Sequence, residues 1–129
     1  MYKRTIEKIE NGESLATIDK AKTVAHLASD KKASHIVILE LTHLTIMCNY
    51  FVICTGESSP QIKAIADHIL ENLSKVGVKP QGIEGRQQGH WVLIDFGDVV
   101  VHIFDREKRA YYELEKLWLD APRIDPNLP

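Results

Sequence analysis

Cysteine is scarce in this 129-residue chain, which contains only Cys48 and Cys54. Both fall in one predicted strand, where their Cα atoms would lie about 20 Å apart, too far for a disulfide bond within that strand. We therefore expect two reduced core residues, as in a protein of the cytoplasm.

Long apolar runs are absent too. No stretch reaches the ~20 residues of a membrane-spanning helix, and the charged N-terminus lacks the apolar segment of a signal peptide. A cytoplasmic location is predicted.

An excess of positive charge is missing as well, because the formal net charge is −2. Phosphate contacts need clustered Lys and Arg, so this charge argues against a domain that binds nucleic acid through its overall charge. No two of the six histidines have H-x-x-x-H spacing, and none neighbours a cysteine at ligand distance. Neither a P-loop nor a G-x-G-x-x-G motif occurs. We predict no metal, no cofactor and no catalytic residue, and hence no enzyme.

The most strongly determined stretch is Gly89 to Phe104, which reads GHWVLIDFGDVVVHIF. Two β-branched, apolar runs flank Gly97-Asp98, a glycine-first pair typical of the type II′ turn of a β-hairpin. In that register Phe96 faces Val99, and side chains alternate between the two faces of the sheet. One face is then wholly apolar and suits a core under helices, with Val92, Ile94, Phe96, Val99, Val101 and Ile103.

The opposite face of this hairpin mixes apolar and polar side chains. It carries Trp91, Leu93, Asp95, Val100, His102 and Phe104. This is too apolar for a surface in water, yet a dry core would penalise the carboxylate and the imidazole. Three interpretations stay open: a second layer of the same chain covers the face, another molecule covers it, or Asp95 and His102 form a catalytic pair, for which no nearby nucleophile is found.

The rest of the chain predicts a mixed α/β domain. Helices are expected over residues 15–31, from an N-cap at Ser59 to about residue 75, and over 106–118, with Tyr111, Leu114, Leu117 and Trp118 turned inward. Strands are expected over 35–41 and 48–55, and a short one around Ile83. Residues 1–14 read as a flexible lead-in, 15–120 as a single domain and 121–129 as an extended or disordered tail. We predict a sheet of four or five strands with helices mainly on one face.

Four blocks of the sequence stand in a characteristic order. They are DKKA at 30–33 with the Ile-Val of 36–37; NYFVICTG at 49–56 with Ser58 and Gln61; Glu84-Gly85 with WVLIDFGDVVVHIF at 91–104; and RAYYELEKLW at 109–118. Together these blocks resemble the Iojap family of ribosomal silencing factors. Asn49 stands where the family usually has an aspartate, and Glu40 where an aspartate is common. Residues 1–23 and the tail after Ala121 carry no part of the resemblance.

This resemblance implies a cytoplasmic factor that docks on the large ribosomal subunit through its fourteenth protein. Such a factor would prevent the small subunit from joining and lower translation when nutrients are short. The resemblance also implies a two-layer fold related to nucleotidyltransferases without a working active site, and a tendency to form a homodimer. Neither a membrane nor a specific nucleic-acid sequence is an expected partner.

Carried over onto this sequence, the resemblance makes Trp91 the exposed contact residue of a partner-binding surface. Trp91 and Leu93 would be the apolar anchors, and Asp95, Glu84 and Arg86 would set charge complementarity. The full predicted set is Trp91, Leu93, Asp95, Glu84, Gly85, Arg86, His102 and Phe104. Two alternatives stay open: a nucleotidyltransferase-like enzyme that uses the 56–59 turn for phosphate and Asp95 for a metal, and a module that only dimerises.

Overall fold

The computed structural model describes residues 16–129, so the predicted lead-in of residues 1–14 lies outside the described part of the chain. Four helices are described: α2 (Thr17–Asp30), α3 (Ser59–Lys75), α4 (Arg106–Tyr112) and α5 (Leu114–Leu117). The strands are β1 (Ser34–Glu40), β2 (Tyr50–Thr55), β3 (Gly82–Glu84), β4 (Trp91–Asp95), β5 (Val99–Phe104) and β6 (Arg123–Ile124).

The described strands form one six-stranded sheet in the order β3-β4-β5-β2-β1-β6. The central pair, β2 and β5, is parallel, and every other neighbouring pair is antiparallel. The predicted mixed α/β class is confirmed, with more strands than the expected four or five. The additional strand is β6, whose two residues pair with Ile38 and Leu39 of β1. A strand this short leaves no alternating pattern in the sequence, so part of the predicted tail is in fact a sheet edge.

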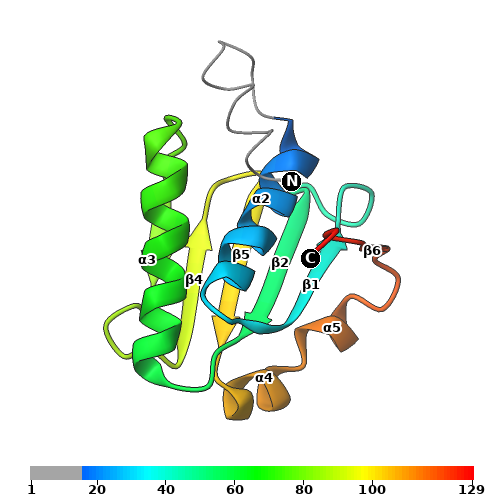
Figure 1. The fold of residues 1–129 in the computed structure, drawn as a ribbon. Coiled ribbons are helices and arrows are strands. Elements are labelled where there is room, and N and C mark those ends of the chain that lie inside the picture. Colours follow the sequence, from blue (N-terminus) through cyan, green and yellow to red (C-terminus); the bar gives the residue numbers. More distant parts are fainter. Residues whose placement is uncertain (1–15) are drawn as a thin grey trace.

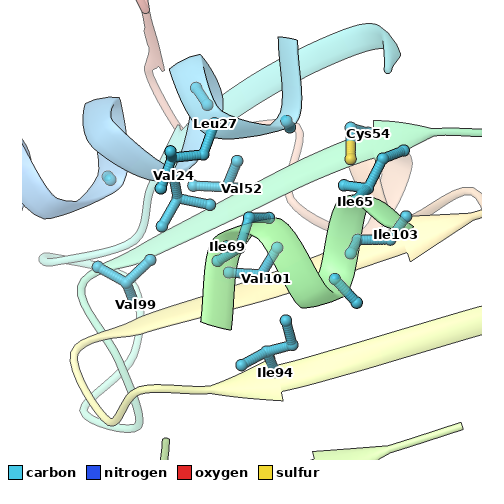
Figure 2. Close-up of a cluster of buried hydrophobic side chains, with 14 of the residues drawn as sticks. Val24, Leu27, Val52, Cys54, Ile65, Ile69, Ile94, Val99, Val101 and Ile103 are labelled. Carbon is cyan, nitrogen blue, oxygen red and sulfur yellow. The ribbon is translucent and has the colours of Figure 1, made fainter. Parts of the chain in front are cut away.

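One face of the sheet carries both long helices, α2 and α3, which lie side by side over it (Figure 1). The core between them is closed, since Val24, Ile69, Ile94 and Val101 are all fully buried. Figure 2 shows these side chains meeting from α2, α3 and the central strands. Each such side chain contributes roughly 1.5–3 kcal/mol by leaving water. The wholly apolar hairpin face is therefore the helix-covered one, as predicted.

The hairpin of β4 and β5 has the predicted register. Ile94 pairs with Val101, and the Phe96 N–H donates to the Val99 carbonyl at 2.9 Å. Gly97 has φ +91°, which a glycine-first turn requires. The turn is anchored to α2, because the Asp98 carboxylate accepts hydrogen bonds from Lys20 and Thr17.

Helix α3 begins one residue earlier than predicted. The N-cap is Ser58, not Ser59, and the Ser58 Oγ accepts a hydrogen bond from the Gln61 N–H at 3.2 Å. Both serines satisfy the composition rule for a cap, but only Ser58 has the extended backbone that places its hydroxyl over that N–H. At the other end, Gly77 follows the C-cap with φ +81°, a left-handed conformation that glycine adopts without strain.

The prediction of a single helix over residues 106–118 is wrong, because the structure has two short helices there. Glu113 adopts a left-handed conformation, φ 45° and ψ 51°, which ends α4 and turns the chain into α5. Leu114 and Trp118 pack on the sheet as expected, whereas Tyr111 and Leu117 are 78% and 72% exposed. Helical periodicity cannot predict such a corner, since it follows from contacts with the sheet rather than from a glycine or proline.

Candidate partner-binding face

The second face of the sheet holds the predicted site, and we call it the Trp91 face. It consists of the side chains of β4 and β5 that point away from α2 and α3: Trp91, Leu93, Asp95, Val100, His102 and Phe104. The register extends this face across the sheet, because Leu93 pairs with both Glu84 of β3 and His102 of β5. On the next strand, β2, Phe51 pairs with Val100 of β5.

The chain covers only part of this face. The segment from Asp105 to Ala121, which contains α4 and α5 and which we call the strap, lies along the lower end of the sheet in Figure 1. Trp118 of the strap contacts Phe51 edge-on, with ring centroids 6.2 Å apart. Trp91, Leu93, Asp95 and Val100 nevertheless stay half-buried and reach the surface. Cover by the same chain, one of the three open interpretations, is therefore correct for the β1 side and incomplete around Trp91.

Trp91 sits in an aromatic cluster that fixes its indole. Its ring centroid lies 4.9 Å from that of Phe104 and 4.5 Å from that of Tyr112 on α4. The indole Nε1–H donates to Nδ1 of His102 at 3.2 Å. Held on two sides, the indole presents a rigid apolar surface with little rotamer freedom left to lose on binding.

His102 and Phe104 were predicted to contact a partner, but they are only 4% and 1% exposed. Their place is beneath Trp91, where they support it. Burial lowers the pKa of His102 to about 4, so the ring is neutral at pH 7 and its Nδ1 can accept the indole hydrogen bond. Its Nε2 is buried without a hydrogen-bond partner among the described residues. No hydrogen bond joins this ring to Asp95 in the described chain, since Asp95 pairs with Val100 and His102 with Leu93.

Asp95 and Glu84 place two carboxylates at the edge of the Trp91 face. Asp95 is half-buried and its Oδ1 accepts the Gly97 N–H at 2.7 Å, whereas Glu84 is exposed opposite Leu93. Burial raises the pKa of the Cys48 thiol, and the charge of Asp95 raises it further. The face thus combines an apolar centre with an acidic rim.

Gly85 shapes the backbone at the start of β4 rather than offering a contact. It has φ +77°, and a Cβ at this position would lie 2.0 Å from the Trp91 carbonyl oxygen. No other residue fits that approach without moving the strand that carries Trp91.

Arg86 is not part of the Trp91 face. Its guanidinium pairs with Asp67 of α3, with Nε and Nη2 donating at 2.8 and 2.5 Å. This directs the side chain toward the helix-covered side of the sheet. The predicted role of Arg86 in charge complementarity on this face is therefore corrected.

Tyr112 was missed by the sequence analysis. The helical stripe favoured its neighbour Tyr111, yet the corner at Glu113 rotates Tyr112 onto Trp91. The only signal in the sequence was that two tyrosines, Tyr111 and Tyr112, are consecutive, so that a rotation of the helix could bring either ring onto the sheet.

Within residues 16–129, no group of three or more His, Cys, Asp or Glu side chains is arranged to hold a metal ion. In the same part of the chain, no helix has both the length and the apolarity to cross a bilayer.

Comparison with known proteins gives a consistent result. Residues 14–129 match a protein family described as "Ribosomal silencing factor during starvation". The chain is 45% identical over 96 residues to the ribosomal silencing factor of Halalkalibacterium halodurans, covering 74% of this chain and 82% of that protein. It is 42% identical over 104 residues to that of Bacillus subtilis, covering 81% and 88%. A crystal structure of a Chromobacterium violaceum protein superposes with a TM-score of 0.78 at 36% identity, covering 80% of this chain and 86% of the other.

Proposed function

Because the chain belongs to the family of ribosomal silencing factors, we propose that it docks on the large ribosomal subunit through the Trp91 face. In this proposal the partner is the fourteenth protein of that subunit. The bound chain then occupies the place where the small subunit would join, and translation falls under nutrient limitation. It acts by steric exclusion, without turnover, in the cytoplasm.

The observation that carries the proposal is an apolar patch that the fold prepares but leaves partly open. Trp91 and Leu93 follow one another on this face of β4, and Val100 lies diagonally from Leu93 on β5. All three remain half-buried, while the same strands are fully covered on their other face. Tryptophan is enriched among residues that dominate interface energies, and truncation of a central anchor typically costs about 2 kcal/mol or more. A rigid indole suits that role.

The acidic rim supports a partner with a basic surface. Glu84 and Asp95 border the apolar patch, and the whole chain carries a net charge of −2. Charges at a rim raise the association rate and orient the partner more than they add affinity. We expect Glu84→Gln to slow association and to weaken its dependence on salt.

The direct test is co-sedimentation of the Trp91→Ala variant with purified large subunits. Loss of about 2 kcal/mol predicts a Kd at least 30-fold weaker, and loss of the block to subunit joining in the same assay. Ile83→Ala is a matched control, since Ile83 is a 42%-exposed apolar side chain on neighbouring β3 that belongs to the other face. Equal binding by a folded Trp91→Ala variant would refute the assignment.

Two further measurements address the alternatives. Calorimetry with nucleotide and Mg²⁺ tests for a nucleotidyltransferase-like enzyme, and we expect no heat of binding. Sedimentation equilibrium of the free chain, with and without Trp91, tests whether the same face forms a homodimer. A dimer that persists without Trp91 would place self-association elsewhere on the molecule.

A further inference from the structure

The strap is attached to the sheet by both apolar and polar contacts, and its apolar contacts come from Leu114, Trp118 and Ala121. Neither α4 nor α5 contains a buried residue. A cavity of about 400 Å³ lies between the strap and the end of the sheet, lined by His35 and Thr55 on one side and by Arg106, Arg109 and Glu115 on the other. Polar contacts across this pocket add to the apolar packing of Leu114 and Trp118 on the sheet.

Arg109 makes those contacts from the middle of α4. Its Nη1 donates to the His35 carbonyl at 2.5 Å and to Thr55 Oγ1 at 2.8 Å, and its Nη2 donates to Glu115 at 3.1 Å. One guanidinium thereby joins α4 to β1, to β2 and to α5. The side chain is only 14% exposed, where charge-assisted hydrogen bonds are less weakened by water.

The same helix reaches Trp91. Tyr112 lies three residues beyond Arg109, about one turn along α4, and its ring centroid is 4.5 Å from that of Trp91. The left-handed Glu113 follows directly, and its N–H donates to the Arg109 carbonyl at 3.0 Å. A left-handed non-glycine residue is disfavoured by the backbone, so tertiary contacts must hold this corner, and Arg109 supplies them on both sides of it.

We propose that Arg109 is a positioning residue for the Trp91 face. It locks the strap onto the sheet and thereby holds Tyr112 against Trp91, which fixes the indole in the orientation that docks. The consequence for binding rests on the proposed function, whereas the effect on the indole concerns the free chain alone.

The experiment compares Arg109→Gln with Arg106→Gln. The control removes an arginine from the same helix whose ion pair with Glu57 is largely exposed, with side chains 71% and 53% accessible. The chain has two tryptophans, so their indole N–H signals in ¹H–¹⁵N spectra report on Trp91 and Trp118 separately. We expect Arg109→Gln to shift the Trp91 signal, to speed its hydrogen exchange and to weaken the Kd for large subunits at least tenfold. Arg106→Gln leaves all three unchanged.

A double-mutant cycle separates positioning from a general loss of stability. If Arg109 acts through the indole, Arg109→Gln weakens binding much less in a Trp91→Phe background than in the unmodified chain. Equal weakening in both backgrounds, or an unchanged Trp91 signal, would overturn the proposal.

The test still gives an answer if the variant does not fold or if the chain does not bind large subunits. Should Arg109→Gln fail to fold, Arg109→Lys keeps the charge but loses the planar fork, and we expect intermediate effects on the signal and on the Kd; an unchanged Trp91 signal in this variant would overturn the proposal as well. If the unmodified chain does not bind large subunits, the proposed function fails, and the indole signals alone decide whether Arg109 positions Trp91.

Discussion

The two faces of one hairpin differ in what covers them. Val92, Ile94, Val101 and Ile103 are fully buried under α2 and α3, each of which lays an apolar stripe along the sheet. On the other face, the strap contributes short helices without a buried residue, and Leu93 stays half-buried. Alternation along a strand therefore specifies which residues share a face, whereas the length and apolar content of the covering element decide whether that face becomes core or stays partly exposed.

Neighbouring residues of β4 give the sharpest test of this difference. Ile94→Ala removes a fully buried side chain, so the free energy of unfolding should fall by about 2–5 kcal/mol. Leu93→Ala, one residue away on the Trp91 face, should cost about 1 kcal/mol in stability but weaken binding to large subunits about tenfold. Denaturant unfolding and co-sedimentation of both variants measure the two effects. Similar stability losses would mean that the Trp91 face is core as well.

The two faces should also respond to acid in different pH windows, and His102 sets the first. Burial lowers its pKa to about 4 from an ordinary 6.5. Between these two values, His102 is protonated in the unfolded chain but neutral in the native chain. The free energy of unfolding is therefore at its full value above pH 6.5 and falls as the pH decreases to about 4. The loss is on the order of 3 kcal/mol. Unfolding curves between these pH values should show this slope, and His102→Asn should remove it. A slope that survives the substitution would assign it to other groups.

Two glycines with positive φ compare the edge of the Trp91 face with the end of α3. A Cβ at Gly85 would lie 2.0 Å from the Trp91 carbonyl oxygen, while a Cβ at Gly77 meets nothing within 4 Å. Gly77→Ala should cost about 1–2 kcal/mol from backbone strain alone. Gly85→Ala should cost more than that and should weaken binding, because β4 must shift. Thermal unfolding and co-sedimentation of both variants check these expectations. Equal losses of stability would show that β4 can shift at little cost to accommodate the added Cβ.

Some features of this molecule could be predicted from residues along one element, and others could not. The register of β4 and β5 follows from Gly97 and from alternation, and the α3 stripe follows from its 3.6-residue period. The corner at Glu113, the pairing of Arg86 with Asp67, and the contact between Tyr112 and Trp91 join elements far apart in sequence. No local pattern encodes them. The place of Trp91 on a partly open sheet face was thus predicted, and its role as an anchor stays a prediction. His102 and Phe104, which lie buried next to it, were predicted as contacts, and Tyr112 was missed.

The smallest effect is expected where the hairpin turn meets the helix-covered face. Burial tends to raise the pKa of Asp98, but hydrogen bonds from Lys20 and Thr17, together with the Lys20 charge, outweigh this and lower it below its ordinary value of 3.8. The ion pair therefore stabilises the native chain above that pH and stops doing so as the pH falls through the lowered pKa. Because Asp98 is 29% exposed, solvent screening limits the contribution to about 1 kcal/mol. Asp98→Asn should thus lose about 1 kcal/mol at pH 7 while keeping the His102 slope. A variant that lost that slope instead would show that the two faces titrate as one unit.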